Sequence, residues 1–190
     1  MKGIFSAFGI ALALGPCSAR AIEVIDRTEY YEVRGNTADG LARDMAAKGP
    51  QHPTGRRAWG YTDWRVNSTY VLVPRDRGCE LGDVRVQLTV VTTLPRWVPS
   101  GVPAHPRLKR DWTRLLARIA EHEDTHRAHG LEAAALAEQR IASIPLQKDC
   151  ATAEKSARRA LRVSVLELTA VSRAFDRETD FGRRQGVGLR

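Results

Sequence analysis

The spacing of apolar residues changes midway along this chain, and that change restricts the fold more than any other feature. Residues 22–33 and 84–94 are rich in β-branched and aromatic side chains, which is typical of strands. In residues 108–143 and 149–175, apolar side chains instead recur every three or four positions, which predicts two long amphipathic helices. Strands followed by helices favour an α+β fold, with an antiparallel sheet packed against two long helices.

Shorter elements complete this expectation. Residues 37–48 are predicted to form a short helix, residues 58–73 one or two strands, and residues 75–82 a turn. The strand at residues 84–94 is either interior or an edge that an extended peptide pairs with. Gly130 is predicted to kink or interrupt the first long helix.

The first 21 residues have the pattern of a secretory signal peptide. After Lys2, residues 3–15 form an apolar run that is shorter than the roughly 20 residues needed to span a bilayer. Pro16 ends the run, and Ala-Arg-Ala at residues 19–21 matches a cleavage site. We therefore expect export to a periplasm or the extracellular space, with residues 22–190 forming a single domain and no stable membrane span after cleavage.

Export has consequences for the cysteines and for the charge. Removing the signal peptide leaves Cys79 and Cys150, which are expected to form one disulfide in an oxidising compartment. The formal net charge is +8, but the basic residues are scattered, as on an ordinary solvated surface. No specific nucleic-acid partner is expected, and the oligomeric state is left open.

The first long helix carries the sequence HEDTH at residues 122–126, an H-E-x-x-H motif. Two histidines four residues apart on a helix project from one face about 6 Å apart, so His122 and His126 can bind one zinc ion. Glu123 is rotated away from them, towards a metal-bound water whose proton it can accept as general base. This spacing predicts Glu123 as the catalytic residue and one Zn²⁺ as the cofactor.

A catalytic zinc site normally has a third protein ligand, and the motif alone does not identify it. His129 shares the helical face but lies about 10 Å along the axis from His122, and Glu154 lies on the inner stripe of the next helix. The metzincin pattern requires Gly at position 129 and His at position 132, whereas this chain has His129 and Glu132. That class of metalloprotease is therefore disfavoured.

Several segments together resemble the bacterial DUF922 family: YYEVRGNTADGLARDM, GRRAWGYTDWRV, LPRW, HEDTH, Cys150 and FDRETDFGRRQG. The resemblance covers nearly all of residues 22–190 and implies a secreted, zincin-like, zinc-dependent protease with His122 and His126 as ligands and Glu123 as catalyst. The family pattern has a histidine where this chain has Phe181. The resemblance therefore adds Asp176 and Asp180 as further candidates for the third ligand, or implies an impaired site.

The sequence thus predicts an exported zinc metallopeptidase that hydrolyses amide bonds in a peptide or protein substrate. The departure at Phe181 favours an alternative, a non-catalytic binding or structural protein of the envelope that retains the fold. Neither the substrate nor the cleavage preference follows from the sequence.

Overall fold

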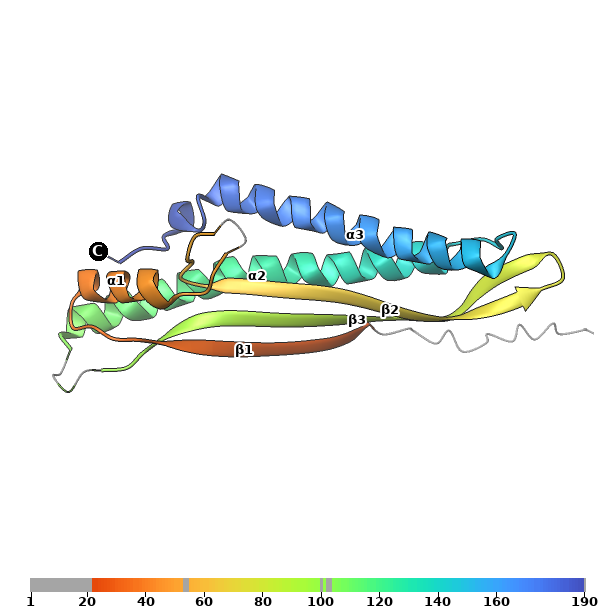
Figure 1. Cartoon of the computed structure of the whole chain (residues 1–190). Helices are drawn as coiled ribbons and strands as arrows, with labels where there is room; N and C mark the ends of the chain where they lie inside the picture. Colours follow the sequence, from red (N-terminus) through yellow and green to blue (C-terminus); the bar gives the residue numbers. More distant parts are fainter. Residues whose placement is uncertain (1–21, 53–54, 100, 102–103, 190) are drawn as a thin grey trace, which may run out of the picture.

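The computed structural model describes residues 22–52, 55–99, 101 and 104–189, so the predicted signal peptide, residues 1–21, lies outside the described residues. The α+β class is confirmed (Figure 1). In chain order, the elements of the described residues are β1 (Glu23–Val33), α1 (Ala38–Lys48), β2 (Tyr61–Arg75), β3 (Gly78–Trp97), α2 (Pro106–Ala142), α3 (Cys150–Thr179) and the 3₁₀ helix η1 (Arg183–Gln185).

The strands form one mixed sheet within the described residues, in the order β1-β3-β2. The expectation of an antiparallel sheet holds for β2 and β3 but is wrong for β1, which pairs with β3 in parallel. The physical reason is connectivity. β2 and β3 form a hairpin and so run antiparallel, whereas α1 and β2 lie between β1 and β3 in the chain and allow β3 to run in the same direction as β1. From Gln87 to Thr93, β3 is paired with β1 on one side and β2 on the other, so this part of the strand is interior and is not an edge that an extended peptide can pair with.

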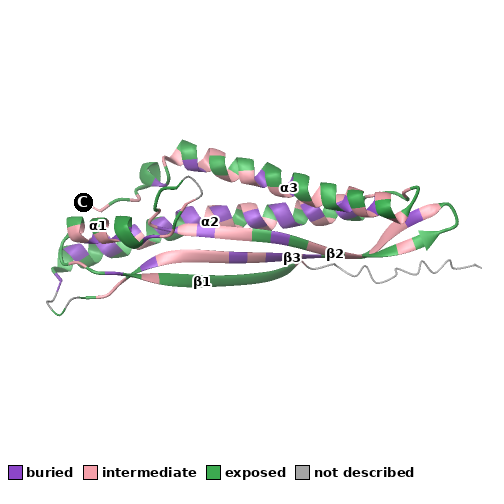
Figure 2. Ribbon diagram, in the orientation of Figure 1, coloured by how far each residue is buried: buried purple, intermediate pink, exposed green. Residues whose placement is uncertain are grey.

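One face of the sheet is covered by α2, and α3 packs on α2 along the edge of the sheet formed by β2 (Figures 1 and 2). Helix α2 runs without interruption through Gly130 and supplies residues to successive apolar clusters. In the first cluster, Leu115 and Ile119 pack with α1 and with the end of β1. In the next cluster, Ala133 and Ala137 pack with β2, β3 and α3. Between the two clusters the buried stripe of α2 becomes polar, and the HEDTH sequence lies there.

The two ends of the molecule join different segments of the chain. At one end, the predicted disulfide between Cys79 and Cys150 is confirmed, with Cα atoms 4.9 Å apart, and it links the β2–β3 hairpin to the first residue of α3. At the other end, α1, the C-terminal turn of α3, η1 and the segment before β2 lie close together (Figure 1). Among the described helices, none is both long enough and apolar enough to cross a membrane. The disulfide is compatible with export.

Candidate metal centre

Three possible metal-ligand atoms converge between α2 and α3. The Nε2 atoms of His122 and His126 are 3.3 Å apart, and Asp176 Oδ1 lies 3.3 Å from the first and 3.0 Å from the second. All three residues are buried. Among the described residues, they form the one group of histidine, cysteine and carboxylate side chains close enough to hold an ion together.

The position of each ligand follows from its helix. His122 and His126 are one helical turn apart on α2, where their ring centroids are 5.0 Å apart. Asp176 lies in the last turn of α3, which brings a residue 50 positions from His126 along the chain into direct contact with it. The ring of Phe175 stacks on the His122 ring with centroids 4.9 Å apart and restricts the orientation of that ring.

Glu123 lies beside this cluster and is itself buried. Its Oε2 atom is the one buried side-chain oxygen in the described part of the chain that has no hydrogen-bond partner. Gly60 makes room for this side chain, because a Cβ at that position would lie 2.9 Å from Glu123 Oε1 and 2.4 Å from a methyl carbon of Ile119. An unpaired buried carboxylate oxygen is costly unless it serves a bound group, so this atom is available to a ligand of the site.

The segment after α3 turns back to support His122. Asp180 and Phe181 have φ values of 50° and 52°, and Gly182 follows at 81°. A Cβ on Gly182 would lie 2.8 Å from a methyl carbon of Val187, so the reversal requires glycine here. The turn places Gln185 Oε1 2.7 Å from His122 Nδ1. An acceptor at Nδ1 holds the proton there and leaves Nε2 free to bind a metal.

Burial and hydrogen bonding shift the pKa values of these groups. Burial raises the pKa of the Asp176 carboxyl, but hydrogen bonds from His122 and His126 outweigh it and hold that pKa well below its usual range. Burial also raises the pKa of Glu123, and the neighbouring histidines offset this only in part. Asp176 is therefore a carboxylate at neutral pH, which is the form that binds metals, while Glu123 has the stronger affinity for a proton.

The other candidates for the third ligand lie elsewhere. His129 is directed to Ser172, with Nδ1 2.9 Å from the serine hydroxyl. Glu154 is near the opposite end of α3 and pairs with Arg158. Asp180 caps the C-terminus of α3 and is half-exposed, with its carboxylate 3.5 Å from Arg183. Of the residues that the sequence left open, Asp176 alone joins the two histidines within the described residues.

The structure also places His52 next to the cluster, a position that the sequence did not indicate. The His52 side chain is mostly covered, and its Nε2 lies 3.6 Å from Asp176 Oδ2. Its ring contacts Tyr61 and Phe181, each with centroids 5.7 Å away. No periodicity or spacing connects position 52 with position 176, so the sequence held no signal for this contact.

The residues present fit a zinc ion. Two ligand atoms bound about 2.0 Å from a tetrahedral ion lie about 3.3 Å apart, which is close to the separations of 3.0 to 3.3 Å observed here. Two imidazoles with one carboxylate are also a donor set typical of catalytic zinc, and it leaves a fourth position for water or substrate. The unpaired Glu123 Oε2 is the buried acceptor that such a position requires.

A family model described as a bacterial protein of unknown function, DUF922, matches residues 28–182. The matched range includes every residue of the His122, His126 and Asp176 cluster. No curated protein and no solved structure matches the chain.

Proposed function

This chain belongs to the DUF922 family of bacterial proteins of unknown function, and we propose from the geometry of its site that it is a zinc-dependent peptidase. His122, His126 and Asp176 hold the ion, and Glu123 is the general base. The observation that carries this proposal is the buried, unpartnered Glu123 Oε2 beside three ligand atoms at tetrahedral spacing.

A zinc ion held by His122, His126 and Asp176 would supply a Lewis acid for the scissile carbonyl and would lower the pKa of the attacking water. Glu123 accepts the proton of that water at Oε2 and delivers it to the amide nitrogen as the C–N bond breaks. Burial suits the carboxylate to both roles, because it raises the pKa of Glu123 towards the working pH. Gln185 and Phe175 keep the His122 ring in the orientation that binds the ion.

The alternative is a non-catalytic envelope protein that retains the metal. Such a protein would bind zinc through the same three residues, but the unpaired oxygen of Glu123 would have no catalytic role. The two functions therefore differ at Glu123, and a substitution there separates them.

The first test is the zinc content of the oxidised full chain, measured by inductively coupled plasma mass spectrometry. We expect about one zinc per chain, lost in His126→Ala and retained in His129→Ala, since His129 lies on the same helix but contacts Ser172 instead. The absence of zinc under conditions that load other zinc enzymes would rule out the site.

The second test is hydrolysis of a mixture of unstructured peptides by the loaded protein. Glu123→Gln should retain zinc and lose roughly 10²- to 10⁴-fold in rate, because the amide cannot accept the proton. If the unsubstituted protein binds zinc but cleaves no peptide, the non-catalytic alternative is correct. Equal rates for the two proteins would exclude Glu123 as the base.

A further inference from the structure

Strand β1 has a free edge. Within the described residues it pairs with β3 alone, so the backbone N–H and C=O groups on its other edge have no strand partner. Figure 1 shows no described helix or strand beyond this edge, and in Figure 2 the strand is coloured as exposed over most of its length. Val24 and Tyr30 on this strand are 41% and 54% exposed. An edge of this kind is a template for pairing with another strand.

We propose that β1 is a homodimer interface, where two copies of this chain pair antiparallel about a two-fold axis through Thr28. The sheet would then continue from one protomer into the other. The proposal does not depend on the metal centre, which lies between α2 and α3.

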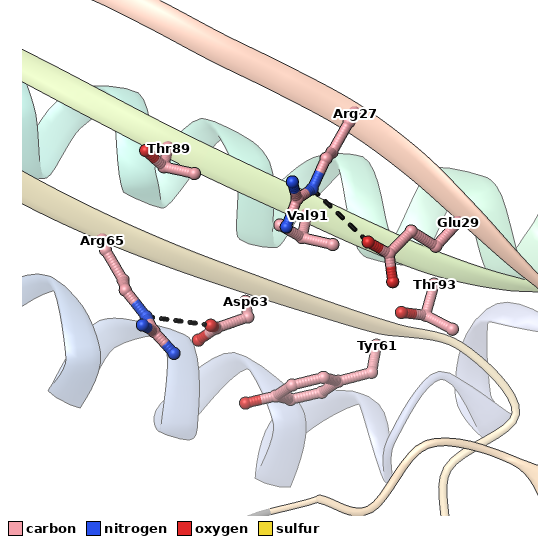
Figure 3. Close-up of a pocket in the computed structure, with 8 residues that line it drawn as sticks. All are labelled: Arg27, Glu29, Tyr61, Asp63, Arg65, Thr89, Val91 and Thr93. Atoms are coloured by element: carbon pink, nitrogen blue, oxygen red, sulfur yellow. Dashed lines mark ion pairs between the residues drawn. The ribbon is translucent and has the colours of Figure 1, made fainter.

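The charges on β1 are complementary in this register. Arg27 and Glu29 project from the same outer face of the sheet, both more than half exposed, and lie 3.4 Å apart within one chain (Figure 3). With the axis through Thr28, Arg27 lies opposite Glu29 of the partner subunit, and symmetry repeats the pair. Opposite charges at directly facing positions stabilise an antiparallel pair.

The inner face contributes a facing threonine pair and diagonal apolar contacts. There, Thr28 faces Thr28 of the partner subunit, which is a favourable cross-strand pair. Val24 lies diagonal to Tyr30 of the partner subunit, within reach of an aromatic ring, and symmetry again repeats the contact. Each pairing covers apolar surface that one chain leaves exposed.

Neighbouring registers lack the charge complementarity of the outer face. An axis through Arg27 places that residue opposite itself, and an axis through Glu29 does the same for two carboxylates. Like charges at facing positions are destabilising. The alternating signs therefore select the Thr28 register, instead of simply repelling every other strand as edge charges often do.

A cysteine at the axis tests this register directly. In antiparallel strands, facing Cα atoms are about 4.5 to 5.5 Å apart, which is within the range for a disulfide. In the full chain with Cys17→Ser, we expect Thr28→Cys to form a covalent dimer on mild oxidation. Val24→Cys is the matched control on the same exposed strand, because its two copies would lie about 27 Å apart. Equal cross-linking of both variants, or of neither, would overturn the proposal.

A charge exchange gives an independent measurement that needs no cysteine. Arg27→Glu should raise the dimer dissociation constant, measured by sedimentation velocity, by about tenfold or more, because both symmetric pairs become repulsive. Arg27→Glu combined with Glu29→Arg restores both pairs at the original net charge and should restore dimerisation. A chain that is monomeric at all concentrations, or a double variant no better than the single one, would contradict the proposal.

Discussion

His52 and Asp176 illustrate how one distant contact completes a site. One oxygen of Asp176 faces His122 and His126, while the other lies 3.6 Å from His52 Nε2. A ligand carboxylate that is held at its outer oxygen has a fixed orientation, and such partners tune metal affinity. We therefore predict that His52 acts as a positioning residue in the proposed zinc site, although it does not touch the three-atom cluster itself.

We predict that His52→Ala weakens zinc binding by about 10- to 100-fold. The affinity is measured by competition with a chromophoric chelator. His52→Gln keeps a nitrogen donor of similar reach and should recover part of the loss, whereas His129→Ala should leave the affinity unchanged. An unaltered affinity in His52→Ala would show that Asp176 needs no support from position 52.

Within α2, the role of Gly130 is set by packing. The sequence suggested a kink or an interruption there, but the helix continues from Pro106 to Ala142. A Cβ at Gly130 would lie 2.9 Å from Trp64 Cγ, so the glycine lets β2 approach the helix closely. The close approach lies one helical turn beyond His126, where α2 returns from the polar site to the apolar core.

Gly130→Ala is therefore expected to destabilise the protein. Helix propensity alone favours alanine by about 1 kcal/mol, but overpacking against the Trp64 ring costs about 1 to 3 kcal/mol. Urea unfolding followed by circular dichroism measures the change in the free energy of unfolding. Gly40→Ala in α1 is the control, since the closest neighbour of its added Cβ would be the Thr37 hydroxyl at 3.1 Å, which caps α1 at the surface and is not part of the packed core. A stabilised Gly130→Ala protein would mean that Trp64 moves freely.

Over the whole molecule, the disulfide and the site lie at opposite ends of α3. Cys150 is the first residue of that helix, and Asp176 is in its last turn. Two backbone hydrogen bonds between Cys79 and Gln147, of 2.8 and 2.9 Å, join the same two segments. The covalent link therefore reinforces an end of the fold that does not contact the metal ligands.

Replacing both cysteines by serine should lower the free energy of unfolding by about 4 kcal/mol, because the bridge closes a long loop in the unfolded chain. The measurement is urea unfolding of the double variant beside the oxidised parent. Zinc content under native conditions should not change, since the ligands are remote from the bridge. Loss of zinc in a folded double variant would show that the two ends are coupled.

Local features of this protein were predictable from its sequence. The periods of the apolar residues distinguish strands from helices, and they were sufficient for the α+β class. The spacing of His122 and His126 implies one shared face, because helical geometry alone brings residues four apart together. The pairing of Cys79 with Cys150 was predictable because the expected export places the chain in an oxidising compartment and leaves it two cysteines.

The tertiary structure decided what depends on contacts between distant segments. The parallel pairing of β1, the contact of Asp176 with the two histidines and the approach of His52 all join residues far apart in the chain. No pattern within a single segment specifies such contacts, since they arise only when the helices and strands pack. The sequence therefore specifies the local geometry of the two histidines, while packing determines that Asp176 is the third residue of the cluster.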